Sequence, residues 1–158
     1  MDGLVAELLA CPDCRLALVA QEGALRCSGC GAAYPEKDGV VLLLPRGGRT
    51  EDPWQETATQ LDGYLGSHPE TARRLLDGPP DTGMTVDFAC GTGTLIEDLL
   101  AGTHGRIIGT DISPRVLRRL RRRCPPAHGS RLDPLAVDAR RMAFRDGSLD
   151  RLTTFESL

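Results

Sequence analysis

Several kinds of sequence feature are scarce or missing in this chain of 158 residues, and each absence excludes a class of protein. Aromatic residues make up only 4%, so a core must be built from leucine, valine, isoleucine and alanine. No apolar run approaches the roughly 20 residues that a membrane-spanning helix needs. Residues 1–10 contain no base, unlike a signal peptide, and the net charge of −3 gives no general attraction to nucleic acid. We therefore expect a cytoplasmic protein without membrane contact.

The cysteines that are present are arranged as metal ligands rather than as a disulfide framework. Four of the six form two Cys-x-x-Cys pairs, Cys11 with Cys14 and Cys27 with Cys30. Two such turns together supply the closed four-sulfur shell of a structural Zn²⁺ ion, with no position left for water. Gly31 follows the second pair, where a backbone turn toward sulfur needs a permissive residue. The alternatives are two unrelated pairs or a redox motif, but neither pair lies between a strand and a helix.

The region around these cysteines is predicted to be a small β-rich module. Residues 16–19 and 24–26 are expected to form a hairpin about the turn at 21–23, and the apolar run 40–44 predicts a buried strand. The sequence resembles the zinc-ribbon domain of the Trm112-like family, both in its cysteines and in the segments Ala32-Ala33-Tyr34-Pro35 and Lys37-Asp38-Gly39-Val40. Members of that family act as partners of methyltransferases or are fused in front of them.

The rest of the chain predicts an α/β fold in which strands and helices alternate. Strands are expected over 84–88, 106–110, 135–137 and 149–154, and helices over 94–101 and 115–124, the second capped by Ser113 and Pro114. Such alternation is typical of a Rossmann-like parallel sheet, here a partial one of about four strands. We therefore predict a zinc-ribbon module over 1–46, a linker and broken helical region over 47–83, and a sheet domain over 84–158.

A glycine-rich turn follows the first predicted strand of this sheet. Gly91 and Gly93 allow a ligand to approach the backbone closely at the start of a helix. Asp111 ends the next strand, at the sequence separation from the glycine-rich turn where a carboxylate holds the ribose of a nucleotide. Asp138 follows the third strand. Each aspartate alone has an ordinary alternative as a capping or turn residue. Ile96 occupies the third glycine position of the dinucleotide fingerprint, which disfavours nicotinamide and flavin cofactors.

These motifs together resemble the class I S-adenosylmethionine-dependent methyltransferases. The family's first motif is matched by Asp87-Phe88-Ala89-Cys90-Gly91-Thr92-Gly93, with alanine at the first glycine position. By resemblance, the two glycines pass under the methionine part of the cofactor and Asp111 holds the ribose hydroxyls. Ile112 is then expected against the adenine ring. The resemblance implies eight cofactor-binding residues: Asp87, Ala89, Gly91, Gly93, Asp111, Ile112, Asp138 and Ala139.

The sequence does not identify the methyl acceptor or a general base. A complete methyltransferase sheet in this family has seven strands, and the Asn/Asp-Pro-Pro-Tyr signature of amino-group methylation is absent after the fourth strand. Either the chain is a truncated product, or a second copy or another partner chain completes the sheet.

The leading hypothesis is an S-adenosylmethionine-dependent methyltransferase acting on a small molecule. One alternative is a non-catalytic accessory or cofactor-binding fragment of a methyltransferase. Another is a ribosomal or transfer RNA methyltransferase. Residues 115–123 contain six arginines, whose side chains could contact RNA phosphates. We expect this arginine run to be a solvated helix face instead, since no aromatic residues are interleaved with it.

Overall fold

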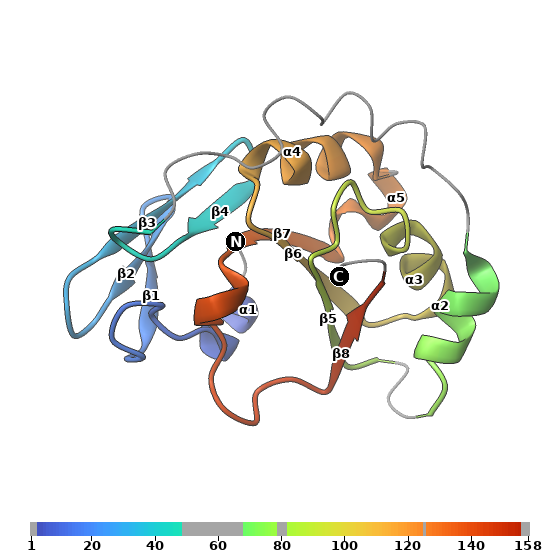
Figure 1. Ribbon diagram of the computed structural model, residues 1–158, viewed down its shortest axis with the longest axis horizontal. Helices are drawn as coiled ribbons and strands as arrows, with labels where there is room; N and C mark the ends of the chain where they lie inside the picture. The colour runs from blue at the N-terminus through green and yellow to red at the C-terminus, as the bar shows by residue number, and fades with distance from the viewer. Residues whose placement is uncertain (1–2, 49–67, 79–81, 125, 156–158) are drawn as a thin grey trace.

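A single sheet of eight strands runs through the protein, in the order β1-β2-β3-β4-β7-β6-β5-β8 (Figure 1). The computed structural model describes residues 3–48, 68–78, 82–124 and 126–155, apart from the side chains of residues 126 and 127. The first half of the chain supplies the antiparallel strands at one end of the sheet. The second half supplies the parallel strands at the other end, with helices packed above them.

The parallel part consists of β5 (Met84–Phe88), β6 (Arg106–Asp111), β7 (Leu132–Val137) and β8 (Arg151–Thr154). Two helices, α3 (Ile96–Gly102) and α4 (Pro114–Arg123), connect successive strands, and their buried side chains share one hydrophobic cluster with β6 and β7. The prediction of a Rossmann-like sheet of about four parallel strands is therefore confirmed. The complete sheet is larger, because the N-terminal module adds four strands to it.

The N-terminal module contains α1 (Gly3–Leu8), β1 (Leu18–Gln21), β2 (Ala24–Cys27), β3 (Ala33–Lys37) and β4 (Val40–Leu43). These strands pair antiparallel with their neighbours, and the expected hairpin turns at Glu22 and Gly23, both of which have positive φ. Strand β3 was not predicted. It contains Pro35, which cannot donate a ladder hydrogen bond, and among its side chains only Tyr34 is buried.

The two halves meet where β4 pairs with β7 in parallel, from Val41 opposite Leu135 to Leu43 opposite Val137. The core continues across this junction, since Leu43, Val137 and Phe144 belong to the cluster that also contains the first cysteine. The apolar run 40–44 indicated a buried strand but not its partner. The sheet is therefore continuous where the sequence suggested separate modules, and the boundaries at 46 and 83 stay a prediction.

Several elements begin at different residues from those expected. Helix α3 starts at Ile96 rather than at residue 94, because the turn after Gly93 extends to Leu95. Strand β7 begins at Leu132, three residues before the predicted strand over 135–137, and runs through Pro134. Helix α4 begins as expected, and the Ser113 side chain accepts a hydrogen bond from the Val116 amide at 3.2 Å.

The remaining elements are short. They are α2 (Pro69–Leu75), α5 (Pro126–Gly129) and a 3₁₀ turn (Ala139–Arg141). Most of the linker and broken helical region predicted over 47–83 lies outside the described residues, and α2 is the helix seen within its described part. Among the described helices, none combines the length and the apolar character that crossing a membrane would require.

Candidate metal centre and cofactor-binding edge

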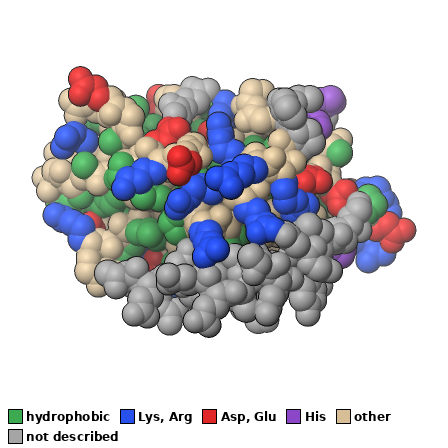
Figure 2. Space-filling view, turned by 90° about the horizontal axis from the view of Figure 1, so that it is seen from above, with side chains coloured by type: hydrophobic (Ala, Val, Ile, Leu, Met, Phe, Trp, Pro, Cys, Tyr) green, Lys and Arg blue, Asp and Glu red, His purple; other side chains and the backbone are tan. Residues whose placement is uncertain are grey.

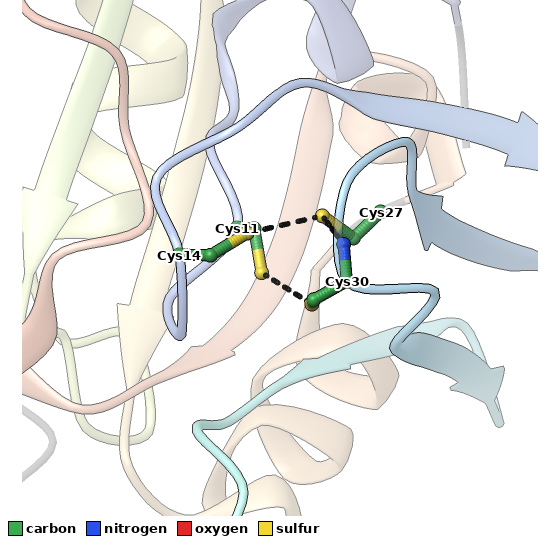
Figure 3. Close-up of side chains that lie close together, drawn as sticks. All are labelled: Cys11, Cys14, Cys27 and Cys30. Atoms are coloured by element: carbon green, nitrogen blue, oxygen red, sulfur yellow. Dashed lines mark hydrogen bonds between the residues drawn. The ribbon is translucent and has the colours of Figure 1, made fainter.

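The four predicted zinc ligands gather at one point, although they come from two separate turns (Figure 3). Their sulfur atoms all lie within 4.8 Å of one another, with Cys11 Sγ 3.7 Å from Cys30 Sγ and Cys14 Sγ 3.4 Å from Cys27 Sγ. Cys11 and Cys27 are buried, and Cys14 is the most exposed of the four. Four thiol ligands at this spacing fit a tetrahedral Zn²⁺ ion and leave no open position for a reacting water.

Backbone amides of the second knuckle point at one of these sulfurs. The amides of Gly29 and Cys30 both lie 3.4 Å from Cys27 Sγ, and hydrogen bonds led by that of Cys30 lower the pKa of Cys27 to about 6. Gly31 has a φ of +71°, as expected for a knuckle turn. The second turn therefore favours the thiolate form that a metal ion requires.

A hydrogen-bond network around the first knuckle was not predicted from the sequence. The buried Tyr34 hydroxyl lies 3.1 Å from Cys11 Sγ and 2.9 Å from Asp13 Oδ2. Asp13 also accepts hydrogen bonds from the backbone amide and the Nε of Arg46, both at 3.0 Å. The sequence does show a carboxylate between two cysteine ligands, but the residues that this carboxylate contacts are distant in the sequence. Groups of this kind orient metal ligands.

The glycine-rich turn adopts the backbone conformation that its sequence suggested. Gly91 has a φ of +56° and Gly93 a φ of +85°. A Cβ atom added to Gly93 would lie 2.2 Å from Leu120 Cδ1, whereas one added to Gly91 would meet nothing within 4 Å. Ala89 also has a positive φ, +53°, so alanine at this position carries backbone strain in addition to one extra methyl group.

Asp111 lies at the end of β6 and links the turn to the start of α4. Its Oδ2 accepts from the Gly91 amide at 3.1 Å and its Oδ1 from the Ser113 amide at 2.9 Å. The neighbouring Ile112 is half-buried. Asp111 therefore has the ordinary role of a turn and capping residue, and the expected ribose contact stays a prediction.

Asp138 follows β7 and caps the 3₁₀ turn that begins at Ala139. Its Oδ1 accepts from the backbone amide and the Nε of Arg140, both at 3.0 Å, and its Oδ2 accepts from Arg140 Nη2 at 2.6 Å. Hydrogen bonds from Arg140 lower the pKa of this carboxyl below its usual value. Arg140 itself is exposed, and this pair was not predicted from the sequence.

Asp87 differs from the other two carboxylates because its side chain is directed at Thr153 on the neighbouring strand β8. It is 2% exposed and accepts a hydrogen bond of 2.8 Å from Thr153 Oγ1 on β8. Burial raises the pKa of Asp87 to about 6, and the Thr153 hydrogen bond opposes that rise only in part.

The strand register brings the predicted residues to one edge of the sheet. β5, β6 and β7 are parallel, with Asp87 opposite Gly109 and Asp111 opposite Ala136, so the segments that follow these strands emerge together. Ligands of open parallel sheets bind at this edge. A cavity of about 870 Å³ lies between the first knuckle and the segment 139–149. Of the eight predicted cofactor residues, only Ala139 lines this cavity.

The arginines of α4 are only partly solvated. Figure 2 shows basic side chains gathered on the face seen from above, which is the side that α4 covers in Figure 1. Arg118 lies 3.7 Å from Asp38, while Arg123 pairs with Glu97 and donates to the Thr92 carbonyl at 3.0 Å. Arg121 and Arg122 are exposed. Part of this helix face therefore holds the two halves of the protein and the glycine-rich turn in place.

Two known families match this chain, one in each half. The family described as Trm112p-like protein matches residues 2–39, and the family described as methyltransferase domain matches residues 85–158. A UPF0434 protein of Nitrosococcus oceani is 36% identical over 58 residues, which are 35% of this chain and 98% of that protein. The predicted order of a Trm112-like zinc ribbon followed by a methyltransferase domain is confirmed.

Longer relatives match a little over half of the chain. Ribosomal protein L11 methyltransferases of Pseudomonas paraeruginosa and Pseudomonas aeruginosa are 43% identical over 93 residues, 56% of this chain. The chain spans only 27% of the length of these curated relatives.

Two solved structures are similar to this chain over part of its length. One is the glycopeptide N-methyltransferase MtfA complexed with S-adenosylmethionine (16% identity, TM-score 0.40, 56% of this chain and 41% of that one). The other is CalS10, an amino pentose methyltransferase of Micromonospora echinaspora (19%, TM-score 0.46, 68% and 44%).

Proposed function

The chain belongs to the Trm112p-like proteins through its N-terminal residues and carries a methyltransferase domain behind them, and from this we propose that it transfers the methyl group of S-adenosylmethionine. The observation that carries the proposal is the strand register, which places the glycine-rich turn, Asp111 and Asp138 at one edge of a parallel sheet. We propose a small molecule as the acceptor, because the described surface offers no aromatic platform for bases beside the α4 arginines.

The proposed cofactor contacts follow the order of the strands. Gly91 and Gly93 lie where backbone can pass close to the methionine part, and Asp111, at the end of β6, would hold the two ribose hydroxyls. Ile112 is available to the face of the adenine ring. Asp138 has one lone pair left on Oδ2 for the adenine amino group, next to the backbone of Ala139.

Asp87 and Ala89 have supporting roles in this proposal. Asp87 is a desolvated carboxylate whose pKa of about 6 would fall if a cationic group of a ligand lay beside it. Ala89 holds the strained turn that aims the Gly91 amide at Asp111.

When bound, S-adenosylmethionine would supply an electrophilic methyl group on a sulfonium sulfur. That methyl group would pass to a lone pair of the acceptor, and the pair of the broken carbon–sulfur bond would stay on sulfur. The residues of this chain would contribute by holding the cofactor in place, because alignment of two reactants removes much of the entropic barrier. The cysteine cluster has a structural role, since a closed four-sulfur shell offers no coordination site for the reaction.

The proposal is tested by calorimetric titration of the chain with S-adenosylmethionine. We expect saturable binding tighter than about 1 mM, and Asp111→Asn should weaken it by about tenfold or more, since a hydrogen bond to a charged group is lost. Asp77→Asn, which removes an exposed carboxylate after α2, is the matched control and should leave the affinity unchanged. Failure of the unsubstituted chain to bind would refute the proposal.

The acceptor class is tested by following a labelled methyl group into small-molecule, protein and RNA fractions of a cell extract. Label in the small molecules supports the proposed acceptor. Label in protein or RNA would overturn it and favour the acceptor type named for the L11 methyltransferases or the RNA alternative. Binding without transfer to any fraction would favour the non-catalytic alternative.

A further inference from the structure

The segment that leaves the zinc-ribbon module ends beside a proposed cofactor residue. Strand β4 is parallel to β7, so residues 45–48 emerge at the same edge of the sheet as Asp138. Leu43 is paired with Val137, the residue directly before Asp138. The parallel pairing thus brings the module's last residues to the cofactor-binding edge, although they lie far away in the sequence.

A cavity of about 270 Å³ separates these two segments. One side is formed by residues 45–48 of the ribbon side, and the other by Asp138, Arg140 and Arg141. Asp138, proposed to meet the adenine amino group, therefore lines a space whose opposite wall is the segment that leaves the zinc-ribbon module. Arg140 adds a planar guanidinium group to this space, of the kind that stacks on aromatic rings.

The wall formed by residues 45–48 is attached to the cysteine cluster through Asp13. Two bonds from Arg46 to the Asp13 carboxylate, both 3.0 Å, fix the backbone and the side chain of this wall residue. Tyr34 donates to the same carboxylate, and its hydroxyl lies 3.1 Å from Cys11 Sγ. A continuous set of contacts therefore joins a proposed zinc ligand to the wall opposite Asp138.

We propose that the zinc-ribbon module completes the adenine end of the cofactor site, with Asp13 as the positioning residue that holds the wall at residues 45–48. The inference rests on the proposed function, because it assigns the 270 Å³ cavity, which Asp138 lines, to the adenine ring of S-adenosylmethionine. It adds to that function a second role for the metal centre. The sulfur cluster fixes Asp13, Asp13 fixes Arg46, and the fixed segment limits the space in which the adenine ring is held.

The test measures binding of S-adenosylmethionine and of adenosine to the zinc-loaded chain and to Asp13→Ala. We expect the substitution to weaken both ligands by about tenfold, because the charge-assisted bonds to Arg46 are lost. Zinc content should stay at one ion per chain, measured with a chromogenic chelator. A purely structural role for Asp13 would lower the melting temperature and leave both affinities unchanged.

Arg15→Ala is the matched control, because Arg15 also joins the first knuckle to the second half of the chain but does so away from the 270 Å³ cavity. It donates to the carbonyls of Met142 and Phe144. This substitution should lower the melting temperature and leave the affinities unchanged.

Gly47→Ala provides a second measurement if Asp13→Ala does not fold. Gly47 has a φ of +71°, and an added Cβ atom meets nothing within 4 Å, so the change alters the wall's backbone without touching the cysteine cluster. It should weaken both ligands as Asp13→Ala does. Unchanged affinity in whichever of the two variants folds overturns the inference, whereas lack of binding by the unsubstituted chain refutes the proposed function itself.

Discussion

Replacing Gly93 with alanine should destabilise the protein far more than the same change at Gly91. Both residues have positive φ, and this conformation costs an alanine about 1–2 kcal/mol. Only at Gly93 does the new methyl group collide with a neighbour, at 2.2 Å from Leu120 Cδ1. Leu120 is buried, so the overpacking adds about 1–3 kcal/mol. The total is about 2–5 kcal/mol for Gly93→Ala and about 1–2 kcal/mol for Gly91→Ala.

The assay is urea denaturation followed by circular dichroism, which gives the free energy of unfolding of each variant. A Leu120→Val background removes the methyl group that collides, at a cost of about 1 kcal/mol of its own. In that background the cost of Gly93→Ala should fall to that of Gly91→Ala, since the backbone strain alone remains. The reasoning is refuted if the two glycine variants are equally stable, or if Leu120→Val leaves the difference between them unchanged.

Two further predictions concern the buried carboxylate and the metal. Asp87 has a folded pKa of about 6, above the roughly 3.9 of an unfolded aspartate, so the fold favours its neutral form and should lose up to about 3 kcal/mol of stability as pH rises from 4 to 7. Asp87→Asn should remove this loss, and identical stability–pH curves for the two proteins would contradict it. Removing zinc with a chelator should lower the melting temperature sharply, because a structural zinc site supplies folding free energy. Cys27→Ser should reproduce this effect and lose the bound metal, whereas Cys124→Ala, which lies outside the cluster, should keep one zinc ion per chain.

Local patterns predicted most of the elements and failed where distant partners decide the structure. The spacing of the cysteines and the strand–turn–helix pattern around Gly91 are local signals, and both led to the correct arrangement. Strand β3 was missed because Pro35 interrupts its pattern, while pairing with β2 and β4 holds it in the sheet. The predicted separation into modules missed the pairing of β4 with β7, because an apolar run shows burial but does not identify the neighbouring strand.

The same distinction between local patterns and distant partners applies to the residues of the candidate sites. Asp111 and Asp138 were predicted as site residues because each lies at or just after the end of a strand, and that role stays a prediction. The Arg140 pair and the burial of Asp87 against Thr153 depend on side-chain geometry that spacing does not contain. Asp13 stands between two predicted ligands and was still missed. Its partners, Tyr34 and Arg46, are brought to it only by the folded ribbon. Whether a second chain pairs beside β8, at the end of the strand order, stays a prediction.

The pairing of β4 with β7 also has a consequence for how the chain folds during synthesis. The ribbon emerges first from the ribosome, and its last strand, with Val40, Val41 and Leu43 buried in the final structure, has no β7 to pair with until much of the chain has followed. Until then this strand presents an open apolar edge, which is the kind of surface that recruits strands of other chains. Bound zinc would reduce the risk of such pairing only in part, because zinc can fold the ribbon but cannot supply strand β7.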